Sequence, residues 1–359
     1  SIWYFLLSLF EPDKISLYFL NYKLMIVLPP VFFYVLLRRN NVPPPVSFAI
    51  SYLFLISCAN ATVWPKVCHF ALILIFAVFS LISLIRSLVW GFLFTSIGAL
   101  LVSYVRPEFF IVYLMSGILF ILWFLFKYSQ IEKRHLTGLV AGGIISIILL
   151  GLFGCPMVGN RSIIAFGQHF SCNWAAWNGS SLNPWTNWQE IMGKNFGQSQ
   201  SITEALLNNP SAFLRHITCN LQSVIKVVSW LVFPAISRWA KVLLAVAVLF
   251  LIGTYIADIS GIRKNFTDYK IPLIFLGLFL VPVFASIVII FPRTHYLLML
   301  IAISVSMMAI LLINRALIQR IFSHKQLFLI GILVIALTPE FPFPTGTPQA
   351  NLNTIRFVQ

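Results

Sequence analysis

Long apolar runs recur along almost the whole chain, and they limit its fold more than any other feature. The ten runs cover 16–36, 45–61, 67–85, 88–105, 109–126, 137–155, 240–257, 272–291, 296–313 and 326–338. A helix needs about 20 apolar residues to cross a bilayer, so most runs are long enough, while the second, fourth and last are short. Because backbone polar groups in lipid must bond within their own segment, these runs predict helices. We expect an all-α, polytopic membrane protein with about ten spans.

Composition agrees with a membrane protein and argues against a nucleic-acid partner. Of the 359 residues, 60% are hydrophobic and only 9% are charged, too few charges to cover a water-soluble globule. Lys and Arg number 24 against 9 acidic residues, a formal net charge of +15. These cations stand between apolar runs and form no groove that could follow a phosphate backbone. We therefore expect membrane lipids, and no nucleic acid, around this chain.

The basic residues fall on alternate connections between the runs, which predicts an orientation. If the first run passes from outside to inside, every inner connection is basic: Arg38, Arg39, Arg86, Lys127, Lys133, Arg134, Arg263, Lys264, Lys270, Arg315, Arg320 and Lys325. The short outer connections contribute only Lys66, Arg106 and Arg293. Cytoplasmic loops carry an excess of Lys and Arg, so both ends of the given chain are predicted outside.

One long polar segment divides the predicted membrane domain, which covers 1–359. It follows the N-terminal spans in 1–155, occupies an outer loop region at 156–239 and precedes the C-terminal spans and outer tail in 240–359. Within it, Ser201 with Glu204 predicts a helix start, and Asn208-Asn209-Pro210 predicts a break. We expect two short amphipathic helices lying along the membrane interface there. The apolar residues 1–10 are too few for a span, so we expect a helix that begins upstream of Ser1.

Two corners broken by proline, each between two runs, hold the first candidates for chemistry. Arg106-Pro107-Glu108 leaves a guanidinium and a carboxylate near the outer interface, where they could bind a phosphate or a sugar hydroxyl. The later corner, Pro292 to Tyr296, presents Arg293, His295 and Tyr296, which suit phosphate and saccharide. Each corner also has a structural interpretation: an ion pair that closes a helical hairpin, or an aromatic and basic anchor.

The outer segment adds a third group of candidates, because aromatic faces beside amides can hold a sugar ring. They are Arg161, Gln168, His169, Asn173, Trp174, Trp177 and Trp188. The tryptophans also fit an interfacial belt. No carboxylate is near His69 or His216 in sequence, so we expect both to be structural. The five cysteines show no zinc or haem spacing, so we expect them to serve as small apolar side chains, with a bridge such as Cys172–Cys219 in the outer segment as the alternative.

The two corners and the long outer segment after the sixth run resemble the GT-C superfamily of membrane glycosyltransferases, over most of 16–313. The resemblance implies transfer of a sugar from a polyprenyl-phosphate donor to a lipid, glycan or protein acceptor, outside a bacterial inner membrane. Arg106 and Arg293 would hold the phosphate, with Glu108, His169, His295 and Tyr296 as further substrate contacts. In the family the catalytic carboxylate follows the first span, which implies a general base upstream of Ser1, with Glu108 as second choice.

Two other classes of membrane protein stay open on the sequence. A transporter or flippase of lipid-linked or amphiphilic substrates would keep charges near mid-membrane and break helices at paired positions. A cell-envelope oligosaccharide polymerase or ligase shares the many spans and the large outer segment. The chain has no P-loop, GxSxG or HExxH motif. A divalent metal ion is the one cofactor that the sequence leaves open.

Overall fold

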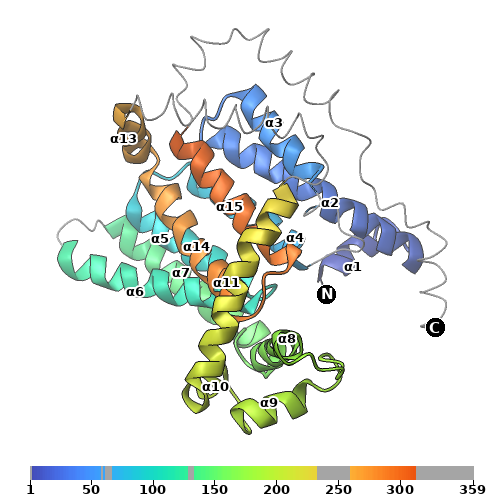
Figure 1. The fold of residues 1–359 in the computed structure, drawn as a ribbon. Coiled ribbons are helices and arrows are strands. Elements are labelled where there is room, and N and C mark those ends of the chain that lie inside the picture. The colour runs from blue at the N-terminus through green and yellow to red at the C-terminus, as the bar shows by residue number, and fades with distance from the viewer. Residues whose placement is uncertain (1, 58–59, 61–66, 128–132, 233–258, 313–359) are drawn as a thin grey trace.

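The computed structural model describes residues 2–57, 60, 67–127, 133–232 and 259–312 (Figure 1). This part of the chain is helical and has no strand. Its elements are α1 (Ile2–Ser8), α2 (Lys14–Arg39), α3 (Pro44–Leu55), α4 (Val67–Ile82), α5 (Leu88–Ser103), the 3-10 turn η1 (Pro107–Phe109), α6 (Phe110–Lys127), α7 (Lys133–Phe153), α8 (Arg161–Asn178), α9 (Trp188–Phe196), α10 (Ile202–Asn208), α11 (Pro210–Val232), α13 (Ile259–Asp268), α14 (Lys270–Ile289) and α15 (Thr294–Leu312). The predicted spans at 240–257 and 326–338 lie outside the described residues.

Four helices of the described chain are long and apolar enough to cross a membrane. They are Lys14–Arg39, Pro107–Phe126, His135–Phe153 and Lys270–Ile289. The other apolar helices, α3, α4, α5 and the apolar part of α15, have 10–17 residues. At 1.5 Å per residue, the 16 residues of α4 extend about 24 Å, less than a hydrocarbon core of about 30 Å. The all-helical class is as predicted and is compatible with a membrane protein, and four helices of the described residues meet the length criterion, so the predicted count of ten spans is not confirmed.

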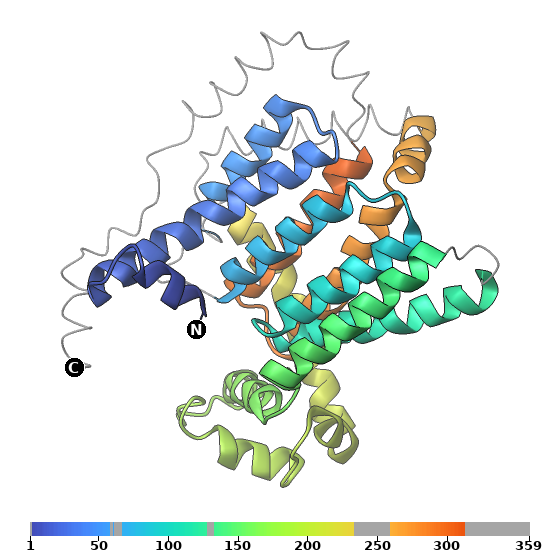
Figure 2. The ribbon, with the colours of Figure 1, turned by 180° about the vertical axis from the view of Figure 1, so that it is seen from behind.

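The helices of the bundle pack through large aromatic side chains. Phe33 of α2 stacks on Phe76 of α4 at 4.9 Å between ring centroids, and Phe79 meets Phe279 of α14 edge to face at 5.1 Å. These four rings are fully buried. Aromatic pairs in such geometries add to the stabilisation that burial itself gives. Figures 1 and 2 show α6 and α7 beside α5, at the outside of this bundle.

The segment predicted as one long outer loop with two short interfacial helices holds α8, α9, α10 and α11 in its described part. α8, α9 and α10 lie at one end of the bundle (Figure 1) and, with the start of α11, enclose a second hydrophobic core. Phe166 and Phe170 are one turn apart on α8, and Met192 and Phe196 are one turn apart on α9. This helical spacing gives each helix an apolar face that is buried against the others. The polar composition of the segment indicates a loop, whereas the spacing of its apolar residues indicates helices.

The predicted helix start and break in 201–210 are confirmed. Ser201 Oγ accepts a hydrogen bond from the backbone N–H of Glu204 at 3.1 Å, and Glu204 Oε2 accepts one from Gln200 N–H at 2.8 Å. α10 ends at Asn208, and Pro210 begins α11. However, α11 is not short: it has 23 residues and packs along α14, as Figure 1 shows, and against α15. It does not stand apart from the bundle as the predicted interfacial helix would.

Two of the connections predicted to face inward come together. Asn41, which follows α2, donates a hydrogen bond from Nδ2 to the hydroxyl of Tyr269 at 3.0 Å, between α13 and α14. Arg39 ends α2, and Lys270 begins α14. The basic residues of these connections therefore lie near one another, at helix ends remote from the α14–α15 corner.

Candidate functional site

The two proline corners meet in space. The Arg106 guanidinium, just before η1, lies over the ring of Tyr296 at the start of α15, with 4.6 Å between Cζ and the ring centroid. Pro107 starts the 3-10 turn that follows α5, and Pro292 separates α14 from α15, so both corners turn where proline removes a backbone donor. Motifs far apart in sequence thus form one site, next to α8.

Arg106 is buried and uses its donors within the protein. Its Nε donates to Glu108 Oε1 at 2.6 Å, Nη2 donates to the same oxygen, and Nη1 donates to Cys68 Sγ at 2.7 Å. The residue is 8% exposed. A buried guanidinium needs such partners, because an unpaired charge out of water is strongly unfavourable. Glu108 Oε2, in contrast, accepts no hydrogen bond from any described residue.

Arg293, unlike Arg106, does not use its donors on described residues of the protein. Its guanidinium lies over the ring of Trp185 at 4.9 Å, its side chain is half-buried, and it makes no hydrogen bond or ion pair with a described residue. The Trp185 ring meets the His169 ring edge to face at 5.4 Å, and His169 stacks on Phe291 at 5.1 Å. The free donors of Arg293 therefore lie beside an aromatic wall formed by Trp185, His169 and Phe291.

His169 brings α8 to this site and is held neutral there. It is 4% exposed, and its Nδ1 has no hydrogen-bond partner in the described chain. Burial, together with Arg293 and His216, lowers the pKa of His169 to about 3. At neutral pH the ring has one donor and one acceptor nitrogen. A buried polar atom without a partner is uncommon, and a bound ligand could satisfy it.

His216 and two asparagines dock the second core on the bundle. The Nε2 atom of His216 lies 3.1 Å from the carbonyl oxygens of both Ile289 and Ile290, at the end of α14. Asn173 Nδ2 donates to His216 Nδ1 at 2.9 Å, and Asn220 Nδ2 donates to the carbonyl of Val288 at 2.8 Å. Carbonyls at a helix C-terminus lack intrahelical donors, and these side chains supply the missing donors. His216 has a structural role, as predicted, and Asn173 uses its Nδ2 within this network.

The remaining predicted residues divide between structural positions and undescribed side chains. Trp174, Trp177 and Trp188 pack around the second core. Arg161 is exposed at the start of α8, and Gln168 is half-buried. His69 is fully buried, with Nε2 3.0 Å from the carbonyl of Asn60, in agreement with its expected structural role. The side chain of His295 lies outside the described residues.

Cys172 and Cys219 are free thiols, so the predicted option of a bridge between them is not realised. Burial raises the pKa of the Cys172 thiol, although the charge of Arg293 opposes the shift.

Most carboxylates of the described chain that the sequence predicts to face outward have structural partners. Asp13 caps α2, with Oδ2 2.8 Å from the backbone nitrogen of Ser16, and Glu190 pairs with Lys194 at 2.6 Å. Glu340 lies outside the described residues. No three His, Cys, Asp or Glu side chains of the described chain gather as metal ligands. With Glu108 paired to Arg106, these residues do not fit a divalent-metal site, and the chemistry at the corners is cationic and aromatic.

Trp185 is not singled out by the sequence, and it lies against Arg293 and His169 because of the tertiary fold. Its only local signal is the turn Asn183-Pro184-Trp185, where Asn183 Oδ1 accepts from the backbone N–H of Trp185 at 2.9 Å. Comparison with known proteins adds no relative: no protein-family model matches the chain, and neither a curated protein nor a solved structure does.

Proposed function

We propose that this chain is an integral membrane glycosyltransferase that takes a sugar from a polyprenyl-phosphate donor and passes it to a lipid, glycan or protein acceptor, at the extracytoplasmic face of a bacterial inner membrane. One observation carries the proposal: the unpaired guanidinium of Arg293 over Trp185, beside neutral His169, at the end of an apolar bundle. A planar fork of N–H donors suits phosphate, and flat aromatic faces suit a sugar ring.

The geometry divides the work between the two arginines. Arg106 uses its donors on Glu108 and Cys68, so we assign it to positioning Tyr296 and the corner. Arg293 then binds the donor phosphate. When the bond between the sugar anomeric carbon and the phosphate oxygen breaks, negative charge grows on that oxygen. Preorganised donors stabilise such charge strongly in a water-poor site.

The acceptor hydroxyl forms the new bond to the anomeric carbon and must lose its proton. Within the described chain, Glu108 is the carboxylate at the corner, and its Oε2 is free to take that proton. His169 Nδ1 or Nε2 would bond a sugar hydroxyl, and Tyr296 and His295 keep their roles as expected substrate contacts.

A transporter or flippase is the second candidate, favoured by prolines inside two candidate spans. Pro29 and Pro30 lie inside α2, and Pro282 lies inside α14. Both helices nevertheless continue past their prolines. The Lys, Arg and His residues of α6, α7 and α14 stand at the helix ends, whereas α2 also carries Lys23 within the helix. A transporter needs its charges near the substrate path across the membrane.

The test uses the full-length protein in native membrane vesicles, which supply the acceptor, with a panel of polyprenyl-phosphate sugars labelled in the sugar. We expect release of polyprenyl phosphate by the wild type and a loss of about 100-fold in kcat/KM for Arg293→Ala, because charge-assisted hydrogen bonds contribute roughly 1.5–3 kcal/mol each. Arg293→Lys should recover part of the rate. Arg215→Ala is the matched control, since Arg215 covers Trp177 at 4.4 Å, outside the two corners.

Wild-type turnover by Arg293→Ala, or turnover of none of the donors, would overturn the transferase. Movement of intact sugar lipid across vesicles without release of polyprenyl phosphate would establish the transporter instead.

A further inference from the structure

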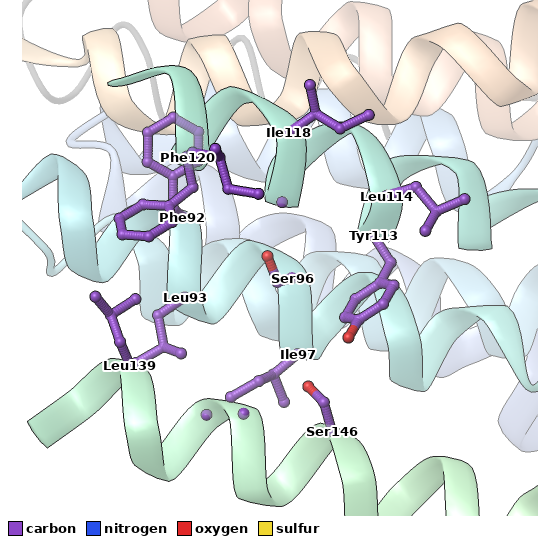
Figure 3. A pocket seen from close by; sticks show the side chains of 14 residues that line it. Phe92, Leu93, Ser96, Ile97, Tyr113, Leu114, Ile118, Phe120, Leu139 and Ser146 are labelled. Atoms are coloured by element: carbon purple, nitrogen blue, oxygen red, sulfur yellow. The ribbon is translucent and has the colours of Figure 1, made fainter. Parts of the chain in front are cut away.

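A cavity of about 360 Å³ lies between α5, α6 and α7 (Figure 3). α6 and α7 each pack on α5, which forms the floor with Phe92, Leu93 and Ile97. The walls include Leu114 and Ile118 of α6 and Leu139 of α7. This volume falls at the small end of ligand sites, which span roughly 300–1,000 Å³. None of the corner residues discussed above lines this cavity.

The cavity opens along α6, toward the surroundings of the bundle. Leu114 and Ile118 are 49% and 58% exposed. The candidate spans that include α6 and α7 are each only 17% buried within the molecule. Apolar surface of this extent is stable in lipid and unfavourable in water. The opening therefore faces lipid chains if these helices span the membrane.

Two hydroxyl groups without partners point into this apolar space. Ser146 is 7% exposed, and neither its Oγ nor the hydroxyl of Tyr113 makes a hydrogen bond to a described residue. Figure 3 shows both groups on the cavity side of their helices, Tyr113 on α6 and Ser146 on α7. Ser96 differs, since its Oγ bonds Ser116 Oγ at 2.7 Å. Two free donors inside an apolar cavity call for an acceptor that a ligand brings.

The ligand must be uncharged and must carry its acceptor below the surface. No Lys, Arg, Asp, Glu or His lines the cavity. At 1.5 Å per residue, Tyr113 and Ser146 lie roughly 9–11 Å from Pro107 and Phe153, the ends of the two candidate spans. A phosphate head group is costly at that depth without a cation, whereas an ester carbonyl is neutral and accepts hydrogen bonds.

We propose that this cavity binds a neutral acylglycerol, with an ester carbonyl accepting hydrogen bonds from Tyr113 and Ser146 and an acyl chain lying along α5. The site shares no residue with the proposed transferase site and does not depend on it.

Glycines provide the space and also offer matched variants. A Cβ added at Gly117 or Gly143, both in the lining, would meet nothing within 4 Å, so a larger side chain would enter the cavity without a clash. Gly142 is different, because its Cβ would approach Leu93 Cδ1 to 2.0 Å, and it is needed for packing of α7 on α5. Gly151 of α7 also faces open space but does not line the cavity, which makes it the control.

The experiment uses the full chain in phosphatidylcholine nanodiscs that contain a diazirine-tagged diacylglycerol. After irradiation, adducts are mapped by mass spectrometry of peptides. We expect adducts on α5, α6 and α7 in the wild type and at least fivefold less labelling in Gly117→Leu/Gly143→Leu. Ser146→Ala/Tyr113→Phe should lower labelling about threefold, and Gly151→Leu should label as the wild type does.

Competition on the unaltered protein decides the class of ligand even if a leucine variant fails to fold. Untagged diacylglycerol should displace the probe. Equal displacement by extra phosphatidylcholine or by polyprenyl phosphate would overturn the proposal, as would wild-type labelling of the folded glycine variant.

Discussion

Arg106 and Arg293 occupy similar corners, yet their surroundings give them different properties. Arg106 is enclosed by Glu108, Cys68 and the ring of Tyr296, so its charge is balanced inside the protein. Arg293 lies over the face of Trp185 and makes no hydrogen bond or ion pair with a described residue. Breaking a buried ion pair by removing one member leaves an uncompensated charge, whereas an exposed pair contributes little. The contribution of an enclosed ion pair and that of an exposed one can each be measured as a change in the free energy of unfolding.

The Arg106–Glu108 pair should matter for stability far more than the exposed Glu190–Lys194 pair. We expect Glu108→Gln to lower the free energy of unfolding by about 3 kcal/mol, because Arg106 keeps its charge without a counter-charge. Glu190→Gln should change it by less than about 0.5 kcal/mol, since Glu190 and Lys194 are 52% and 59% exposed. Denaturant titration in detergent micelles gives both values.

The double variant Arg106→Met/Glu108→Gln is the control for charge, since it leaves no ion buried. It should be more stable than Glu108→Gln alone. Equal losses for the Glu108 and Glu190 variants would show that the corner is held by packing and not by the ion pair.

At the scale of elements, a proline inside α2 leaves a backbone carbonyl without its helical donor, and a side chain distant in sequence bonds that carbonyl. Pro30 has no N–H to donate to the carbonyl of Ile26, one helical turn before it. Asn60, which is fully buried, donates from Nδ2 to that carbonyl at 3.0 Å and to the carbonyl of Leu55 at 3.1 Å. α2 therefore continues through two prolines with this orphan acceptor satisfied.

Asn60→Ala should lower the free energy of unfolding by about 1–3 kcal/mol, the cost of leaving a buried acceptor unsatisfied. In a Pro30→Ala background the same substitution should cost clearly less, because the restored N–H at position 30 bonds Ile26. Denaturant titration of the four proteins measures this coupling. An equal cost of Asn60→Ala in both backgrounds would mean that the Ile26 bond contributes nothing.

Sequence patterns predict single elements here better than they predict how elements meet. The apolar runs place α2, α4–α7, α14 and α15, and Ser201 with Pro210 places the limits of α10. The helical core of the outer segment was predictable in principle from the spacing of Phe166 and Phe170. The length of α11 was not, because its packing on α14 depends on tertiary contacts. Both corners were predicted, but contact between Arg106 and Tyr296 depends on how four helices pack.

At the scale of the whole molecule, two hydrophobic cores are held together by a small polar network. The bundle core and the α8–α11 core have separate sets of buried residues. Between them, His216, Asn173 and Asn220 bond one another and the last carbonyls of α14. For this network, His216 must accept from Asn173 at Nδ1 and donate from Nε2, which only the neutral ring does. The connection between the cores should therefore depend on pH.

Acid should loosen the α8–α10 region before it unfolds the bundle. Burial lowers the pKa of His216 to about 4, although the Ile289 and Ile290 carbonyls oppose the shift, and the pKa of His169 is about 3. Between pH 6.5 and these values the unfolded chain binds more protons than the folded one, so stability is complete above pH 6.5 and falls as the pH drops toward 4. We expect each histidine to account for a loss on the order of 2 kcal/mol by pH 4.5.

Hydrogen exchange of α8–α10 at pH 7.5, 5.5 and 4.5, corrected for the intrinsic exchange rate, measures the opening, and denaturant titration measures the total loss. His216→Gln removes one titrating group, keeps an amide donor for the α14 carbonyls and should retain only the part of the pH dependence due to His169. An identical pH dependence in this variant and the wild type would refute the role of His216.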